Sequence, residues 1–199
     1  MKKLLLFITV LFFGISTINA QDDANYDFAE GDMILGGGIT FNSVDLDGTK
    51  ASSSTIAPSF AYFLSDEWAV GASIGIASQS VDGFDDVSAT VISVGASKFF
   101  LDMGERTKWF YSLAFRNYSG DTADYIAPEI GSEMGESAMQ LSGDLGMTYF
   151  MNENIIMSFT LSNLLSYWSQ GDNSAFGIGW SGEINNIRTA ATLSLAYKF

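Results

Sequence analysis

The 199-residue sequence contains no cysteine and no histidine. Without cysteine the chain can form no disulfide, no thiolate metal site and no cysteine nucleophile. Without histidine it can form neither a Ser-His catalytic pair nor a histidine-ligated metal centre. Basic residues are scarce as well, with 9 Lys and Arg against 23 Asp and Glu, which argues against a nucleic-acid partner because phosphate binding needs cations. We therefore expect no enzyme activity, no cofactor and no metal.

Charged residues of either sign are also few for a chain of this length. They make up 16% of the sequence, whereas soluble domains average about 25%. Apolar residues reach 47% and aromatic residues 14%. Beyond the first 20 residues the sequence has no apolar run of the length that a membrane-spanning helix needs, about 18 residues or more. The apolar residues must therefore be accommodated in another way.

Residues 1–20 have the composition of a secretory signal peptide. A basic start at residues 1–3 precedes an apolar run at residues 4–15, which is shorter than the ~20 residues of a bilayer span. A short polar segment then ends at Ala20, where cleavage would leave Gln21 as the first residue. We expect a bacterial protein that is exported from the cytoplasm. Residues 21–30 would form a short periplasmic segment and residues 31–199 a β-barrel domain.

Apolar residues alternate with small or polar residues, with a period of two, over most of the remaining sequence. This pattern is typical of strands that have one apolar face. The segment at residues 87–100 is the least regular, because Lys98 shares a face with Ile92 and Phe100. Eight such segments are predicted, at residues 33–42, 55–64, 68–77, 87–100, 109–116, 139–149, 155–162 and 187–199.

The connections between these segments alternate in length. Tight or moderate turns are expected at residues 64–67, 101–108 and 151–154, and longer polar loops at 43–53, 78–87, 119–137 and 166–186. Such asymmetry is typical of outer-membrane barrels. A sheet in hydrocarbon must also close, because each unpaired backbone group there costs several kcal/mol. The sequence thus predicts an all-β fold, an eight-stranded antiparallel transmembrane β-barrel with short periplasmic turns and longer extracellular loops.

The predicted inward face is small and polar, which suits the narrow interior of an eight-stranded barrel. It carries two charges, Arg116 and Asp144, on adjacent strands. We expect them to form an ion pair in the lumen, because a lone buried charge is far costlier than a buried pair. Pro58 lies mid-strand on the lipid side and has no N–H, so we expect a bulge there or a position above the apolar band.

Two of the predicted tight turns, together with the strand ends that flank them, form a unit of strand, turn and strand, at residues 60–71 and 146–155. This unit resembles the small outer-membrane β-barrel proteins of the OmpA/OmpW-like kind, especially those of Bacteroidetes, as does the leader junction at residues 19–21. The resemblance implies a monomeric integral protein of the outer membrane in contact with its lipids and lipopolysaccharide. The chain's end is similar to the signal that the barrel assembly machinery recognises in its clients. The residues of this signal are Leu193, Leu195, Tyr197 and Phe199.

The resemblance leaves the function open, because this scaffold hosts pores, adhesins, enzymes and anchors. Our leading hypothesis is an integral outer-membrane protein with a structural or surface-contact role in the bacterial envelope. The alternative is a small channel or conduit for ions or small hydrophobic molecules, in the manner of OmpW, although side chains usually fill eight strands. A soluble lipocalin-like binding protein, with polar residues outside and an apolar pocket inside, is a third hypothesis.

Several loop residues invite more specific interpretations. Residues 45–48 begin like a calcium-binding loop, but Ile56 occupies the position of the distal Glu ligand, so we interpret them as a solvated turn. The acidic stretches at residues 82–86 and 119–137 are interpreted as solvated loops. Trp168, Phe176 and Trp180 in the last loop are interpreted as anchors at the membrane interface rather than as a contact surface.

Overall fold

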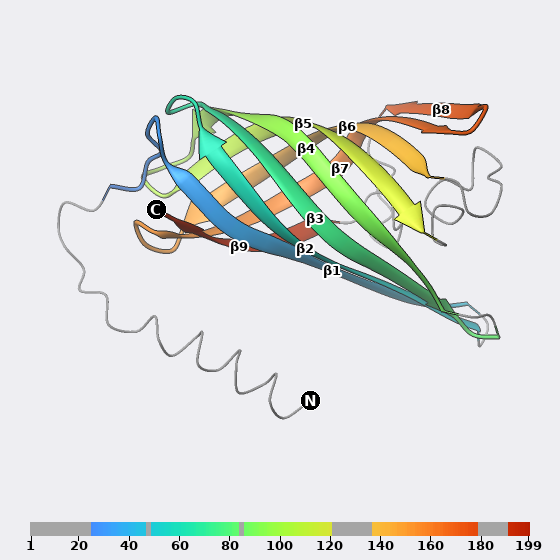
Figure 1. The fold of residues 1–199 in the computed structure, drawn as a ribbon. Coiled ribbons are helices and arrows are strands. Elements are labelled where there is room, and N and C mark those ends of the chain that lie inside the picture. The colour runs from blue at the N-terminus through green and yellow to red at the C-terminus, as the bar shows by residue number, and fades with distance from the viewer. Residues whose placement is uncertain (1–24, 47–48, 84–85, 121–136, 179–190) are drawn as a thin grey trace.

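The computed structural model describes residues 25–46, 49–83, 86–120, 137–178 and 191–199 as an all-β chain (Figure 1). Among these residues no helix is long and apolar enough to cross a membrane. The predicted eight-stranded antiparallel barrel is confirmed, and a ninth, short strand pairs with the outer part of β7. The strands are β1 (Met33–Leu46), β2 (Thr49–Phe63), β3 (Trp68–Val81), β4 (Val87–Asp102), β5 (Thr107–Gly120), β6 (Ala138–Phe150), β7 (Ile155–Gln170), β8 (Asn173–Ile178) and β9 (Ala191–Lys198).

The barrel closes through β9. This last strand pairs with β1 on one side and with β7 on the other, while β1 to β7 pair in chain order. The backbone N–H of Phe199 extends the closing ladder by donating to the carbonyl of Met33 at 2.9 Å. Each strand of the barrel therefore has a partner on both sides, as backbone groups in hydrocarbon require.

Tight turns join β2 to β3, β4 to β5 and β6 to β7 at residues 64–67, 103–106 and 151–154. Side chains cap two of them: Ser65 Oγ accepts from the backbone N–H of Trp68, and Asn152 Oδ1 accepts from that of Ile155. Figure 1 shows the C-terminus and the segment before β1 at this same end of the barrel. We call it the turn end, and the opposite end the hairpin end.

Two of the long loops expected at the hairpin end are mostly strand, so these expectations were wrong. β1 and β2 pair through residues 43–46 and 49–53, and the connection from β3 to β4 shrinks to residues 82–86. The paired residues include Ser43 with Ser52 and Ser54 with Ser78. Serine on both faces hides the alternation, but it leaves the backbone ladder intact. Residues 121–136 and 179–190, in the other two connections, lie outside the described residues.

The outward face of the barrel is apolar. On each strand of the barrel large apolar side chains point away from the lumen and are exposed, in the phase that the sequence predicted. Exposed apolar rows of this kind suit a hydrocarbon surrounding. They include Leu35, Ile39, Ile56, Phe60, Val70, Ile74, Ile76, Ile92, Val94, Leu113, Phe115, Leu141, Phe159, Leu193 and Leu195.

Aromatic side chains gather on the outward face near the turn end. Most are tyrosine or tryptophan, whose rings combine an apolar body with a polar group, as is typical of residues at membrane–water interfaces. The belt marks one border of the apolar band. Its members are Tyr62, Trp68, Phe100, Tyr111, Tyr149, Tyr197 and Phe199.

Pro58 lies neither at a bulge nor above the apolar band, so both expectations for this residue were wrong. It lies on the outward face of β2 between exposed Ile56 and Phe60, which is within the apolar band. The β1–β2 ladder passes through it without a register shift, so there is no bulge. The β2–β3 ladder omits residues 57 and 58 and then resumes in the same register. The strand thus tolerates the missing N–H of proline by giving up ladder pairing at one point.

Phe110 of β5 and Gly146 of β6 face each other inside the barrel. The ring of Phe110 lies directly over Gly146, where a Cβ atom would collide with the ring carbons. The same ring packs against Phe99 of β4, with centroids 5.3 Å apart. Glycine at position 146 therefore makes room for an aromatic side chain in a narrow interior.

We expect Gly146→Ala to destabilise the barrel by about 1–3 kcal/mol, the usual effect of overpacking a filled interior. The measurement is urea unfolding of the protein in lipid vesicles. Adding Phe110→Leu, which removes the ring, should recover most of the loss. Equal stability of the parent and the single variant would show that the ring moves aside without cost.

Candidate functional site

A polar network occupies the lumen on the side formed by β5, β6 and β7. Arg116 lies at its centre, and its Nη2 donates to Asp144 Oδ2 at 2.6 Å. Its Nη1 donates to Ser142 Oγ, and to Gln140 Oε1 at 3.3 Å. Tyr118 donates its O–H to the same Gln140 oxygen at 2.9 Å. The structure thus brings together the two charges that the sequence analysis singled out.

The strand register explains how these residues meet. Arg116 is paired in the sheet with Gln140, whereas Asp144 is four residues further along β6, towards the turn end. The long side chain of Arg116 therefore runs along the inward face of β6 and passes Ser142 before it reaches Asp144. The Asp144 side chain is only 4% exposed. A carboxylate so buried needs its cation, because removing one partner of a buried pair costs far more than the pair itself.

Trp168 belongs to this network and not to a loop. β7 continues to Gln170, Trp168 pairs with Gln140, and its ring lies 5.3 Å from that of Tyr118. Trp168 is 8% exposed, so the expectation of an interface anchor was wrong for this residue. A register shift between β6 and β7 near Gly143 interrupts the alternation, which hid this part of the strand.

The other two residues expected to be interface anchors are Phe176 and Trp180. Phe176 lies on β8 and is 65% exposed, while Trp180 lies outside the described residues. Of the calcium-like segment, Asp45 lies within β1 opposite Lys50, and residues 47–48 are not described. In the described part of the chain no three acidic side chains are placed to hold a metal ion.

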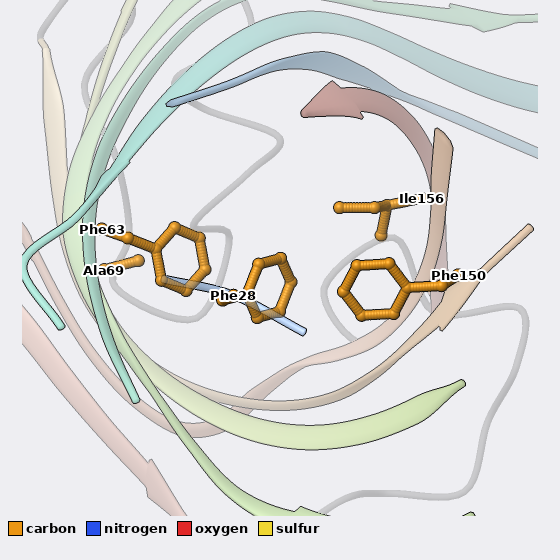
Figure 2. Packing of buried hydrophobic residues seen from close by; sticks show 5 residues of the cluster. All are labelled: Phe28, Phe63, Ala69, Phe150 and Ile156. Atoms are coloured by element: carbon orange, nitrogen blue, oxygen red, sulfur yellow. The ribbon is translucent and has the colours of Figure 1, made fainter. Parts of the chain in front are cut away.

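An aromatic plug, formed by Phe28 and the rings around it, lies in the lumen at the turn end. Phe28, from the segment before β1, is 3% exposed, and its ring stacks on Phe63 with centroids 4.1 Å apart. The same ring lies 4.7 Å from Phe99 and 5.0 Å from Phe150. Figure 2 shows Phe28 between Phe63 on one wall and Phe150 on the other, across the mouth of the barrel. Ala69 and Ile156 complete the buried cluster.

Three cations of the barrel hold the plug segment in place. Lys108 Nζ lies 2.8 Å from Asp27 Oδ1 and 2.9 Å from Asp102 Oδ1. Lys198 Nζ donates to the Asp27 carbonyl at 2.6 Å. Arg106 donates to Tyr26 Oη at 2.6 Å, and its guanidinium lies over the Tyr26 ring. These contacts attach the segment to β5, to β9 and to the β4–β5 turn.

Backbone hydrogen bonds continue the plug into the sheet. Gly31 N–H donates to the Phe63 carbonyl at 2.9 Å, and Phe63 N–H donates to the Asp32 carbonyl at 2.9 Å. Gly31 has a φ of 93°, which glycine adopts without strain. The sequence analysis placed residues 21–30 in a short periplasmic segment and missed the plug. The available signal was the pair of aromatic residues, Tyr26 and Phe28, in an otherwise polar stretch.

The residues expected to form the assembly signal lie on the outward face of the closing strand. Leu193, Leu195 and Tyr197 of β9 are exposed, and so is Phe199 just beyond it. The Tyr197 and Phe199 rings meet edge to face, with centroids 4.9 Å apart. The side chains are therefore accessible on the outside of the barrel, and their role in assembly stays a prediction.

A scan against protein-family models gives no match, and a search of curated proteins gives no similar sequence. Among solved structures, the chain is similar to the outer membrane protein OprG from Pseudomonas aeruginosa, at 17% identity and a TM-score of 0.48, covering 87% of this chain and 98% of that one. It is similar to the N-terminal β-barrel domain of OprF from the same organism, at 14% identity and a TM-score of 0.48, covering 86% and 100% of the two chains. It is also similar to Ail, the attachment invasion locus protein of Yersinia pestis, at 16% identity and a TM-score of 0.43, covering 85% and 99%. At this level of likeness function has to be inferred from the chain's own residues, and the OmpA/OmpW-like and Bacteroidetes assignments stay predictions.

Replacing Arg116 by Ala should destabilise the barrel by roughly 3–5 kcal/mol, because it strands the buried Asp144 carboxylate. Replacing Arg116 by Met and Asp144 by Leu together should cost less than the worse single change. Urea unfolding of the parent, both single variants and the double variant in lipid vesicles gives the coupling energy. If the losses of stability in the two single variants simply add up in the double variant, the two side chains do not interact. The register given above for β5 or β6 would then be wrong.

Proposed function

We propose that the chain is an integral protein of a bacterial outer membrane, exported by a cleaved signal peptide, with a structural or surface-contact role in the envelope. The apolar outward face and the aromatic belt support the membrane location. A lipocalin-like carrier would require the opposite arrangement, with a polar exterior and an apolar pocket. The inward side chains here are small or polar along most of the barrel, and those of Gln140, Ser142 and Asp144 are buried.

The observation that carries this proposal is the plug at the turn end. A conduit needs a continuous path for its cargo through the lumen, and the Phe28 ring fills the mouth between Phe63 and Phe150. Displacing it would also expose a buried apolar cluster and separate Lys108 from Asp27. The closed state is therefore the stable one, which favours a structural or surface-contact protein over a channel.

Partners follow from this role. Membrane lipids and lipopolysaccharide would surround the apolar band, and the barrel assembly machinery would insert the chain, with Phe199 and its neighbours on β9 as the recognition element. The polar hairpins of β1–β2 and β3–β4 extend past the apolar rows at the hairpin end. They supply the surface that a contact role requires. We propose no enzyme activity, because the sequence offers no histidine or cysteine for catalysis.

The membrane location is checked by cell fractionation. We expect the protein in the outer-membrane fraction, with faster mobility on gels before boiling than after it, because a closed barrel resists detergent until heated. Recovery in the soluble periplasmic fraction would contradict the proposal and favour the lipocalin-like hypothesis.

The closed lumen is checked by conductance of the refolded mature protein in planar bilayers. We expect no discrete channel steps from the parent, since the Phe28 plug blocks the lumen. Phe28→Ala removes the ring from the plug, and Phe60→Ala removes a lipid-facing ring of β2 as the matched control. Channel steps from Phe28→Ala but not from Phe60→Ala would show that the plug is the barrier to ions. If neither variant conducts, the rest of the lumen is also closed. Sustained steps from the parent would replace our proposal by the conduit.

A further inference from the structure

Lys98 is an unusual residue on the outer wall of the barrel. Among the described residues it is the only lysine or arginine on the outward side of the apolar band, where its neighbours along β4 include exposed Val94 and Phe100. A lysine facing the bilayer midplane costs roughly 2–4 kcal/mol, but near zero at an interface. Lys98 is paired with Trp68, the first residue of β3, and so lies at the turn end. It can therefore reach lipid headgroups.

Two aromatic residues flank Lys98 on the same face. Trp68 of β3 and Tyr111 of β5 are its direct partners in the sheet, one on each side. Lys98 Nζ lies 5.6 Å from the centroid of the Trp68 ring, and the Tyr111 ring packs on that of Phe100. Trp68 and Tyr111 are both exposed and carry N–H and O–H donors. A cation and two neutral donors thus occupy adjacent positions in one row.

The carboxylate of Glu67 lies next to the row formed by Trp68, Lys98 and Tyr111. Glu67, in the β2–β3 turn, has its Oε2 3.7 Å from Lys98 Nζ, with side-chain exposures of 58% and 32%. The Glu67 carbonyl accepts from the Phe99 N–H at 2.8 Å, which fixes the turn against β4. An exposed ion pair at this distance contributes little to stability. The two opposite charges are therefore available to a ligand that carries both signs.

We propose that Lys98, Glu67, Trp68 and Tyr111 bind the headgroup of a zwitterionic phospholipid with a primary ammonium, of the phosphatidylethanolamine type. Lys98 binds the phosphate, with the Trp68 and Tyr111 donors beside it. Glu67 binds the ammonium. The acyl chains then lie on the apolar face next to the site, where Ala96 is two residues before Lys98 on β4.

A lipid is favoured over a free phosphate or phosphoethanolamine by what surrounds the four residues. The adjacent row of the wall consists of Val70, Ala96 and Leu113, which pair across β3, β4 and β5. Val70 and Leu113 are exposed. A soluble ligand would leave this row uncovered, whereas the chains of a lipid cover it. The inference rests on the membrane location proposed above.

The test is native mass spectrometry of barrels released from bilayers of phosphatidylethanolamine, phosphatidylglycerol and phosphatidylcholine in equal amounts. Heat-modifiable mobility of each sample beforehand shows that the barrel has inserted, so that a failure of membrane insertion is distinguished from a failure of lipid binding. We expect the parent to retain phosphatidylethanolamine in preference to the other two. Lys50→Gln, which removes an exposed lysine at the hairpin end, should behave as the parent does.

The two charges should have different effects. Lys98→Gln should lower retention of both phosphatidylethanolamine and phosphatidylglycerol roughly tenfold, because the phosphate is common to them. Lys98→Arg keeps the cation and should retain both lipids as the parent does. This variant keeps the proposal testable if Lys98→Gln fails to insert. Glu67→Gln should remove the preference for phosphatidylethanolamine while leaving phosphatidylglycerol bound.

Three outcomes would overturn the inference. One is equal retention of phosphatidylethanolamine by the parent and by Lys98→Gln. Another is a preference of the parent for phosphatidylglycerol, which would make the site one for anionic lipids. The third is a loss of both lipids in Glu67→Gln, since the carboxylate would then have no part in choosing the ammonium.

Discussion

Unpaired backbone groups cost several kcal/mol each in hydrocarbon, and the rest of this structure depends on avoiding them. A sheet with an apolar outward face cannot end in an open edge, so β9 pairs with β1 and β7 at once. Pro58 is a local exception to this requirement, and it shows what the sheet keeps where pairing is lost. The chain there gives up ladder pairing between β2 and β3, but it keeps the register on both sides of the gap. A shift of one residue would have turned the apolar row of β2 into the lumen.

Closure of eight strands also fixes the width of the lumen, which is about that of the side chains that fill it. Away from the plug, the inward face of β1 to β4 consists mostly of small residues such as Gly75 and Ser93, whereas β5 to β7 contribute Phe110, Arg116 and Trp168. In that part of the lumen, the wall with large side chains complements the wall with small ones. The Arg116 network fills its part of the lumen with polar atoms that satisfy one another, and the Phe28 plug fills the mouth with rings.

Much of this arrangement could be predicted from the sequence, because the outward face of each strand is apolar and alternates with a small or polar inward face. The strand phase alone places Arg116 and Asp144 on the inward face of adjacent strands, and the length of the arginine side chain then lets the two charges meet. The long hairpins could not be predicted, since both faces are polar beyond the apolar band and the alternation disappears. Trp168 was missed because the register shift between β6 and β7 breaks the pattern. Phe28 was missed because a single ring has no periodicity, and its partners on β2 and β6 are far away in sequence.

The few cations of this acidic chain are unevenly placed. Among the described residues, Lys98, Arg106, Lys108 and Lys198 all lie at the turn end. Three of them hold the plug segment, while Lys98 lies on the outward face beside the Trp68 ring. The same rim therefore carries the plug segment on its inner side and an outward-facing cation on its outer side. Because the plug is attached to β2, β5 and β9 together, loosening it would disturb the closing seam of the barrel, so closure of the lumen and closure of the sheet stabilise each other.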